Sequence, residues 1–318
     1  MQTAVIIDAG RTPIGRFLGG LSAVRPDDLA ALVIRTLVER NEIKGHDVDE
    51  VFFGCANQAG EDNRNVARMS LLLAGLPYNV PGETVNRLCA SGMSSVIHAH
   101  RAASSNDGDL FIAGGVENMT RGPWVISKVS KAYGRDAKMH DSAFGWRFIN
   151  PRMKELYGTD GMGQTAENLA EKYNINREDQ DLFAFNSQMK ASKAQKEGRF
   201  TNEIISVEIP QRKADPIIFN NDEFIRANTS IKTLAKLRPA FQKYGSVTAG
   251  NSSGLNDGAA AMLLASKKGV QENNLAPIAK IISSAVVGVE PRIMGIGPVY
   301  ASIKALKKAN LKMSDIDI

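Results

Sequence analysis

Cysteine and histidine are scarce in this chain of 318 residues, which holds two cysteines and four histidines. Cys55 and Cys89 cannot build a disulfide framework, and they are too few for a zinc site of their own. No apolar run approaches the ~18 residues of a membrane helix, so no membrane partner is expected. The opening MQTAVIIDAG lacks the charged, apolar and cleavage segments of a secretory leader, which predicts a cytoplasmic protein.

Aromatic residues are also few, at 6% of the chain, and the formal charge of +5 is modest. A nucleic-acid-binding protein would show a basic stripe interleaved with aromatics, which this sequence lacks. The small positive charge suits an acidic small molecule such as a phosphorylated cofactor, although it is weak evidence for any partner. A length of 318 residues with 43% hydrophobic residues predicts two or more packed globular units.

The first part of the chain alternates strand-like and helix-like segments. Short apolar runs at Ala4–Asp8, Val51–Gly54 and Leu110–Ala113 predict buried strands. Helical spacing of apolar or small residues predicts helices over Val66–Leu73 and Ala90–Ala103. The alternation predicts an α/β fold with a mostly parallel sheet covered by helices.

Loops lengthen and charge increases after residue 117, and both tryptophans, Trp124 and Trp146, lie in this stretch. Three parts are therefore predicted. They are an N-terminal core of residues 1–117 and 251–270, an inserted loop domain of residues 118–250, and the start of a C-terminal core at residues 271–318. Within these parts the patterns predict helices over Thr165–Tyr173, Arg177–Glu197 and Ala301–Asn310, and regular core segments over Ala259–Ala265 and Ala279–Val287.

A weak internal repeat relates Ile43–Asp49 to Leu311–Asp317, with the lysine and both aspartates identical. Each copy follows an amphipathic helix. If the repeat is real, the protein consists of two similar βα halves, and the second half has barely begun. Chance can also produce so short a match.

The segment richest in chemistry is TVNRLCASGMSS, which surrounds Cys89. An extended run meets a helix at a cysteine flanked by small residues. The start of a helix favours an anion, so a cysteine there is a candidate thiolate nucleophile whose own N–H faces an oxyanion. The alternative is a buried structural cysteine, and the pattern alone does not decide between them. For Cys55 the structural role is favoured.

The stretch VNRLCASGMSSVIHAHRA resembles the nucleophile motif of thiolases, the enzymes that make or cleave β-ketoacyl-CoA. Other segments resemble the same family in the same order along essentially the whole chain: AGGVENMTRGP, QTAENLAEKY, EDQDLFAFNSQMKA, DEFIR, KLRPAF, VTAGNSSGLNDGAAAMLLAS and PRIMGIGPV. The resemblance implies a thiolase-like fold of two βαβα halves with an inserted loop domain, the second half incomplete. It also implies self-association as a dimer or tetramer.

The resemblance implies roles residue by residue. Cys89 would take the acyl group from CoA as a thioester. Arg226, in DEFIR, would lie by the adenine-ribose-phosphate end of CoA, while Phe241, Ala249 and Ser253 would line the pantetheine channel. Coenzyme A and acetyl-CoA would be substrates, with no permanently bound cofactor and no metal.

Residues 144–158, FGWRFINPRMKELYG, most resemble the β-ketoadipyl-CoA thiolases of aromatic-compound degradation. Met162 matches a family methionine near the reacting centre, whereas Gly161 stands where biosynthetic thiolases carry histidine, which argues against a dedicated acetoacetyl-CoA enzyme. A β-ketoadipyl group ends in a second carboxylate, and Arg147 is the candidate cation for it. Alternatively, Arg147 pairs with an acidic residue and shapes its loop.

Three family segments do not occur in this sequence: the CxGxGxG segment with a second catalytic cysteine, the GHP motif and the NEAF motif. No histidine lies in a GHP context, and all are predicted to be structural or on the surface: His46, His98, His100 and His140. We therefore expect the chain itself to be inactive in full turnover. The competing hypotheses are an acetoacetyl-CoA or general 3-ketoacyl-CoA thiolase, a decarboxylating condensing enzyme of the ketosynthase group, and a non-catalytic CoA-binding protein.

Overall fold

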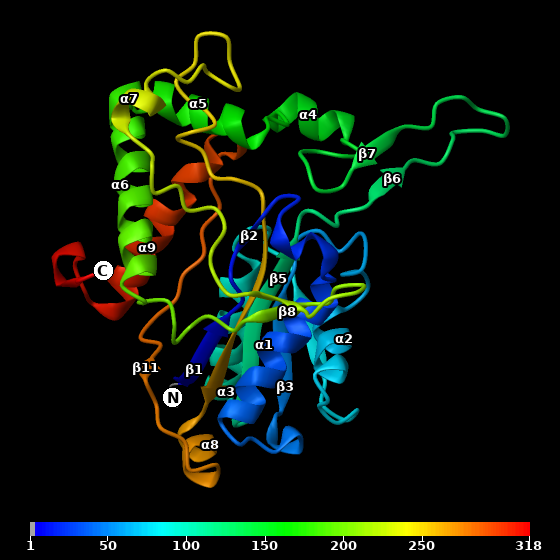
Figure 1. Cartoon of the computed structure of the whole chain (residues 1–318), viewed down its shortest axis with the longest axis vertical. Coiled ribbons are helices and arrows are strands. Elements are labelled where there is room, and N and C mark those ends of the chain that lie inside the picture. Colours follow the sequence, from blue (N-terminus) through cyan, green and yellow to red (C-terminus); the bar gives the residue numbers. More distant parts are fainter. Residues whose placement is uncertain (1–3) are drawn as a thin grey trace. The chain divides into compact units, whose positions relative to one another are not determined.

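The computed structural model describes residues 4–318 and divides them into two compact units (Figure 1). Unit 1 contains the described residues up to Val125, Arg199–Phe224 and Leu255–Ile281. Unit 2 contains Ile126–Gly198, Ile225–Gly254 and Ile282–Ile318. These units differ from the predicted parts, because residues 199–224 belong to unit 1 and not to the insertion.

Unit 1 contains a main mixed sheet, a separate two-stranded antiparallel sheet of β8 and β9, and helices. Its strands are β1 (Val5–Arg11), β2 (Gly15–Arg16), β3 (Glu50–Gly54), β4 (Gly82–Val85), β5 (Leu110–Asn118), β8 (Val207–Ile209), β9 (Ile217–Phe219), β10 (Asn256–Ala265) and β11 (Ala279–Lys280). Its helices are α1 (Pro26–Arg40), α2 (Val66–Leu73), α3 (Ser91–Ser105) and α8 (Lys267–Glu272), with short 3₁₀ turns η1 (Gly20–Ala23) and η2 (Gly45–Asp47). The expected strands and helices of the first part are confirmed.

The main sheet has the order β11-β1-β10-β5-β3-β4, and β2 pairs with β10. Strand β3 runs parallel to both β4 and β5, as the alternation predicted. The mostly parallel expectation is wrong for β10, which runs antiparallel to both β1 and β5. The register explains this, because Asp257 at the start of β10 pairs with Asn118 at the end of β5. A chain that re-enters a sheet at the same edge from which it left needs no crossover connection, so its new strand runs antiparallel to the one before.

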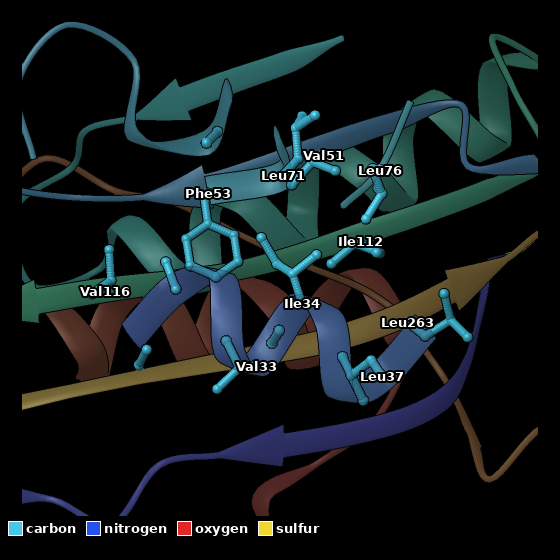
Figure 2. Packing of buried hydrophobic residues seen from close by; sticks show 14 of the residues in the cluster. Val33, Ile34, Leu37, Val51, Phe53, Leu71, Leu76, Ile112, Val116 and Leu263 are labelled. Atoms are coloured by element: carbon cyan, nitrogen blue, oxygen red, sulfur yellow. The ribbon is translucent and has the colours of Figure 1, made fainter. Parts of the chain in front are cut away.

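Alternate residues of the strands build cores on opposite faces of the sheet. Val51, Phe53, Ile112 and Leu263 lie in one cluster with apolar residues of α1 and α2 (Figure 2). The residues between them, such as Phe52, belong to a second cluster with Ala99 and Ala103 of α3, Phe111 and Leu264. The two clusters follow from the period of two in a strand. Each fully buried large side chain contributes about 1.5–3 kcal/mol to folding.

The regular core segment predicted over Ala279–Val287 is shorter in the structure, because β11 ends at Lys280. The ladder between β11 and β1 contains Ala279 and Lys280, and residues 281–290 form no strand. The apolar pattern of residues 279–287 favours a strand, but a strand requires a neighbouring ladder for its backbone groups. Helix α8 precedes this segment.

The regular secondary structure of unit 2 is mostly helical, and long loops connect it. Its helices are α4 (Pro151–Tyr157), α5 (Met162–Lys172), α6 (Arg177–Lys196), α7 (Ile231–Leu234) and α9 (Gly297–Ala309), with 3₁₀ turns η3 (Pro291–Ile296) and η4 (Met313–Asp315). Strand β6 (Trp124–Ile126) lies at the division of the units, and β7 (Met139–Asp141) pairs with it. Within the described residues, no helix is both long and apolar enough to cross a membrane.

The two copies of the weak repeat adopt the same local structure. Turn η2 lies within Ile43–Asp49, and η4 occupies the equivalent positions within Leu311–Asp317. Each follows a long helix, α1 in the first copy and α9 in the second. Similar sequence therefore corresponds to similar backbone in both places.

Candidate active site

Cys89 lies in the short connection between β4 and α3. Its side chain is exposed, whereas Cys55, the other cysteine, is buried. Helix α3 begins at Ser91 after Ala90, so the cysteine immediately precedes the first turn, as predicted. The first backbone N–H groups of a helix and the helix dipole favour negative charge at this position. The arrangement is suited to a nucleophilic thiolate and the oxyanion that it forms.

Glycines allow the start of α3 to lie directly on the sheet. A Cβ at Gly54, the last residue of β3, would lie 2.3 Å from the carbonyl carbon of Ser91. A Cβ at Gly115 of β5 would lie 3.2 Å from the Cα of Gly92. Ser95 donates to the carbonyl oxygens of Gly92 and Gly114. The small residues after Cys89 therefore pack α3 against two strands.

Cys55 is surrounded by carboxylates. Its sulfur lies 3.7 Å from Oδ2 of Asp62, and ligand atoms of Cys55, Asp62 and Glu117 lie within 4.8 Å of one another. Burial, followed by the charges of Glu117 and Asp62, raises the pKa of the Cys55 thiol. Burial also raises the pKa of Glu117. Cys55 is therefore a protonated, inert thiol at neutral pH, and its predicted structural role agrees with this environment.

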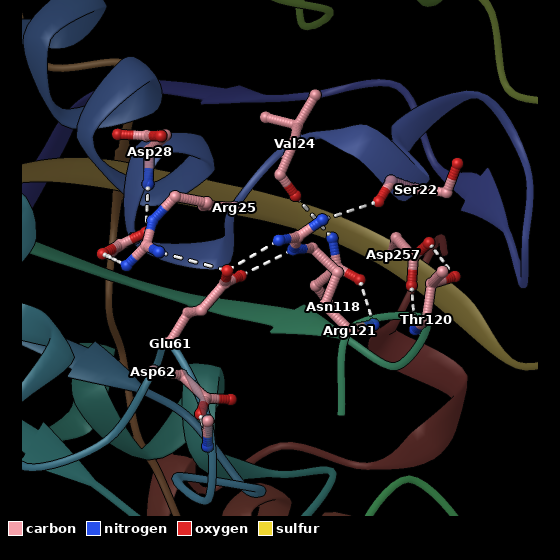
Figure 3. A network of polar contacts seen from close by, with 12 residues as sticks. Ser22, Val24, Arg25, Asp28, Glu61, Asp62, Asn118, Thr120, Arg121 and Asp257 are labelled. Atoms are coloured by element: carbon pink, nitrogen blue, oxygen red, sulfur yellow. Dashed lines mark hydrogen bonds and ion pairs between the residues drawn. The ribbon is translucent and has the colours of Figure 1, made fainter. Parts of the chain in front are cut away.

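An ionic network holds Glu61, the neighbour of Asp62 in the loop that follows β3 (Figure 3). Glu61 accepts hydrogen bonds from Nε and Nη2 of Arg121, both at 2.6 Å, and from Arg25. Arg121 also donates to the carbonyl oxygen of Ser22. Hydrogen bonding by Arg121 lowers the pKa of Glu61, and the charges of Arg121 and Arg25 add to this effect. The loop is thereby bound to the end of β5.

In unit 2 the segment TAGNSSG forms a loop anchored by a buried carboxylate. Glu167 of α5 accepts hydrogen bonds from the backbone N–H groups of Ser246 (3.0 Å) and Val247 (2.9 Å). The Ser246 hydroxyl donates to the same carboxylate at 3.3 Å. Ala249 and Ser253 of this loop are exposed. The helix thus fixes the base of the loop and leaves these two predicted CoA contacts on its surface.

A second buried carboxylate supports the same loop from α6. Asp181 accepts from the Asn251 side-chain amide at 3.0 Å and from Nε of Arg177 at 2.8 Å. Arg177 further donates to the carbonyl oxygens of Leu234 and Leu237. One arginine and one aspartate therefore connect α6, the end of α7 and the loop.

The other predicted CoA contacts also lie in unit 2. Met162 begins α5 and is 64% exposed, and the half-exposed ring of Phe241 lies directly against Gly163, where a Cβ would overlap it. Arg226 is exposed, and its backbone N–H donates to the side chain of Gln188 on α6. Met162 and Phe241 are therefore neighbours, while Cys89 belongs to unit 1.

Arg147 lies in the loop before α4. Its Nη1 donates to the carbonyl oxygen of Ser142 at 3.0 Å, which is a contact within its own loop. This contact, to a backbone carbonyl, matches the part of the alternative in which Arg147 shapes its loop. Trp146 beside it donates to the carbonyl oxygen of Asp160 at 3.2 Å.

The comparisons with known proteins agree with this architecture. The family model of the thiolase N-terminal domain matches residues 4–268, and that of the thiolase C-terminal domain matches residues 275–318. The chain belongs to the thiolase family. It is 54% identical over 319 aligned residues to a β-ketoadipyl-CoA thiolase of Acinetobacter baylyi, covering 100% of this chain and 80% of the relative.

Further thiolases show the same likeness. A 3-oxoadipyl-CoA/3-oxo-5,6-dehydrosuberyl-CoA thiolase of Escherichia coli is 50% identical, again covering 100% of this chain and 80% of the relative. A solved structure of human mitochondrial 3-ketoacyl-CoA thiolase in complex with CoA has a TM-score of 0.91 and 34% identity, covering 100% of this chain and 78% of that one. The thiolase-like fold is confirmed. The expectation of a second half that has barely begun is not supported, because the C-terminal thiolase domain is matched.

Sequence reasoning missed the residues that hold the site in place. Glu167 and Asp181 are 5% and 3% exposed, and both lie within motifs that were used only for their likeness to the family. A carboxylate among small and apolar residues on one face of an amphipathic helix was the available signal. Asn86, whose side chain accepts from the N–H of Leu88 just before Cys89, gave no such signal, because it lies in an extended segment and not on one face of a helix.

Proposed function

We propose that this protein is an acyl-CoA:acetyl-CoA C-acyltransferase that cleaves or forms β-ketoadipyl-CoA through a thioester on Cys89. The observation that carries the proposal is the contrast between the two cysteines of this thiolase-family chain. Cys89 is exposed at the start of α3, whereas Cys55 is buried with a raised pKa. Only Cys89 has the exposure and the position that a nucleophile requires.

In the cleavage direction, the Cys89 sulfur attacks the β-carbonyl carbon of the β-ketoacyl-CoA. The bond between the α and β carbons then breaks, and the two-carbon unit leaves as acetyl-CoA after taking up a proton. The remaining acyl group stays on sulfur as a thioester until the thiol of a second CoA displaces it. For a β-ketoadipyl substrate this group is succinyl, which retains the distal carboxylate.

The start of α3 supports the first of these steps. Attack on a carbonyl places negative charge on its oxygen, and backbone N–H groups at a helix start stabilise such charge. The N–H of Cys89 is our candidate donor. The close packing of Ser91 and Gly92 on the sheet makes this part of the backbone rigid, as a preorganised donor requires.

For CoA, we propose the exposed residues of unit 2: Met162, Arg226, Phe241, Ala249 and Ser253. An apolar wall with a few hydrogen-bonding groups suits a pantetheine arm, and a cation suits the phosphates. The loop that carries Ala249 and Ser253 is fixed by Glu167 and Asp181. The solved human relative with bound CoA supports CoA as the ligand class.

The proposal is tested by acyl transfer from CoA thioesters. The chain is incubated with succinyl-CoA or butyryl-CoA, and protein-bound acyl groups are measured by intact mass together with released CoA. We expect one succinyl group per chain, formed faster than one butyryl group. Cys89→Ser should abolish this acylation, whereas Cys55→Ser is the matched control that retains it.

Two other outcomes would favour other functions. Acylation of neither thiol, with CoA still bound, would favour a non-catalytic CoA-binding protein. Faster butyryl transfer would favour a general 3-ketoacyl-CoA thiolase.

A further inference from the structure

The residue before Cys89 has a strained backbone. Leu88 has φ of +48°, in the left-handed region that branched or bulky side chains rarely adopt. Its side chain is 68% exposed, so burial of the side chain does not impose this conformation. The cause must lie in the hydrogen bonds of its backbone.

Both backbone groups of Leu88 are held by neighbouring residues. Its N–H donates to Oδ1 of Asn86 at 2.9 Å. Its carbonyl oxygen accepts from the Ser91 hydroxyl at 2.6 Å and from the Ser91 N–H at 3.0 Å. The Ser91 hydroxyl also accepts from the N–H of Arg87 at 2.8 Å. Two side chains therefore close a tight turn around Leu88.

The Asn86 side chain is itself anchored. Its Nδ2 donates to the carbonyl oxygen of Ala56 at 3.1 Å. The N–H of Ala56 donates to the carboxylate of Glu117 on β5 at 2.9 Å, as does the N–H of Asn57 at 3.1 Å. The turn around Leu88 is thus connected to the central sheet.

We propose that Asn86 and Ser91 are positioning residues that hold Leu88 in the left-handed conformation and thereby present the Cys89 thiol outward at the start of α3. The proposal rests on the proposed function, in which Cys89 is the nucleophile. The two residues act through the Leu88 backbone. Without them Leu88 relaxes to φ below zero, and the backbone directly before Cys89 rotates away from its reactive orientation.

The experiment compares the rate of Cys89 alkylation by iodoacetamide in the purified chain, measured across pH by peptide mapping. A net hydrogen bond corresponds to roughly a three- to tenfold change in an equilibrium population, so Asn86→Ala should slow alkylation by about that factor. Ser91→Ala should have a similar effect, and Ser91→Thr, which keeps the hydroxyl, should restore part of the rate. If Asn86 and Ser91 only stabilised the fold, these substitutions would lower the melting temperature without changing the rate of Cys89 alkylation in the folded chain.

Leu88 provides a matched pair of controls. Glycine adopts positive φ without a steric penalty, whereas alanine retains the penalty. In the Leu88→Gly background, Asn86→Ala should change the alkylation rate by less than twofold. In the Leu88→Ala background, the three- to tenfold effect should remain. Both single variants at Leu88 leave the core intact because its side chain is exposed.

The outcomes separate the two proposals. An unreactive Cys89 in the unmodified chain would overturn its assignment as nucleophile. A reactive Cys89 whose rate is unchanged by Asn86→Ala would refute the positioning role alone. Equal effects of Asn86→Ala in the glycine and alanine backgrounds would also refute it, because Asn86 would then act by another route than the strain at Leu88.

Discussion

Glu167 provides a sharp test of how unit 2 holds its candidate CoA loop. The substitution Glu167→Gln preserves shape but places an NH₂ group opposite backbone donors. The carboxylate accepts from two backbone N–H groups, and the one at Val247 is buried at 2.9 Å. A hydrogen bond to a charged group contributes about 1.5–3 kcal/mol, and leaving a buried donor unpaired costs about 1–3 kcal/mol. The expected loss of stability is therefore about 2.5–6 kcal/mol.

This loss is large against the roughly 5–15 kcal/mol that stabilises an ordinary domain. Denaturant unfolding, with fluorescence of Trp146 in unit 2 as the probe, measures it. The matched control is Glu171→Gln, an exposed glutamate on the same helix, which should change stability by less than about 0.5 kcal/mol. CoA affinity should fall for Glu167→Gln alone, because the loop with Ala249 and Ser253 loses its support. Equal behaviour of the two variants would refute this reasoning.

Four further outcomes are expected. Arg147→Met should slow succinyl transfer by roughly 10- to 150-fold with butyryl transfer untouched if Arg147 reads the distal carboxylate; a parallel loss of both would mean that it shapes its loop through Ser142. Arg121 lowers the pKa of Glu61 in the folded chain. The stabilisation from the Arg121–Glu61 pair is therefore present above the ordinary glutamate pKa of ~4.3, and it is lost as the pH falls through the lowered pKa of Glu61. Arg121→Met should therefore unfold more readily than the unmodified chain at pH 7, with the difference shrinking by pH 3; a constant difference would exclude the pairing. The buried Cys55 takes no part in the proposed cycle, in which the thiol of a second CoA releases the acyl group from Cys89, so Cys55→Ser should retain acyl release to CoA and Cys89→Ser should abolish it; loss of release in Cys55→Ser would contradict this. Trp124 and Ile126 are 71% and 66% exposed, so light scattering should report a dimer or tetramer; a monomer alone would remove that expectation.

The sequence predicted local elements well where a single pattern dominated. Helix α2 matches Val66–Leu73, and α3 begins one residue after the predicted Ala90, because apolar spacing and small residues act over short distances. The direction of β10 was not predictable, since it depends on which end of β5 the chain returns to after 137 intervening residues, Met119–Leu255. Residues 281–287 show the same limit, because a strand pattern needs a partner that only the fold provides.

The candidate site divides in the same way. Cys89 could be identified from its position between an extended segment and a helix, and its exposure matches a nucleophile. The residues that hold it, Asn86 and Ser91, act through contacts at a backbone angle that no sequence pattern reveals. Glu167 and Asp181 required the fold as well, because a loop about 70–80 positions away brings their partners to them.

The most direct test of the central claim is to locate the acyl group after incubation with acetyl-CoA. The chain is denatured at low pH to preserve thioesters, digested, and analysed by mass spectrometry of the peptides that contain Cys89 and Cys55. The account predicts one acetyl group on the Cys89 peptide that hydroxylamine removes, and none on the Cys55 peptide. Acetylation of Cys55, or equal acetylation of both peptides, would contradict it.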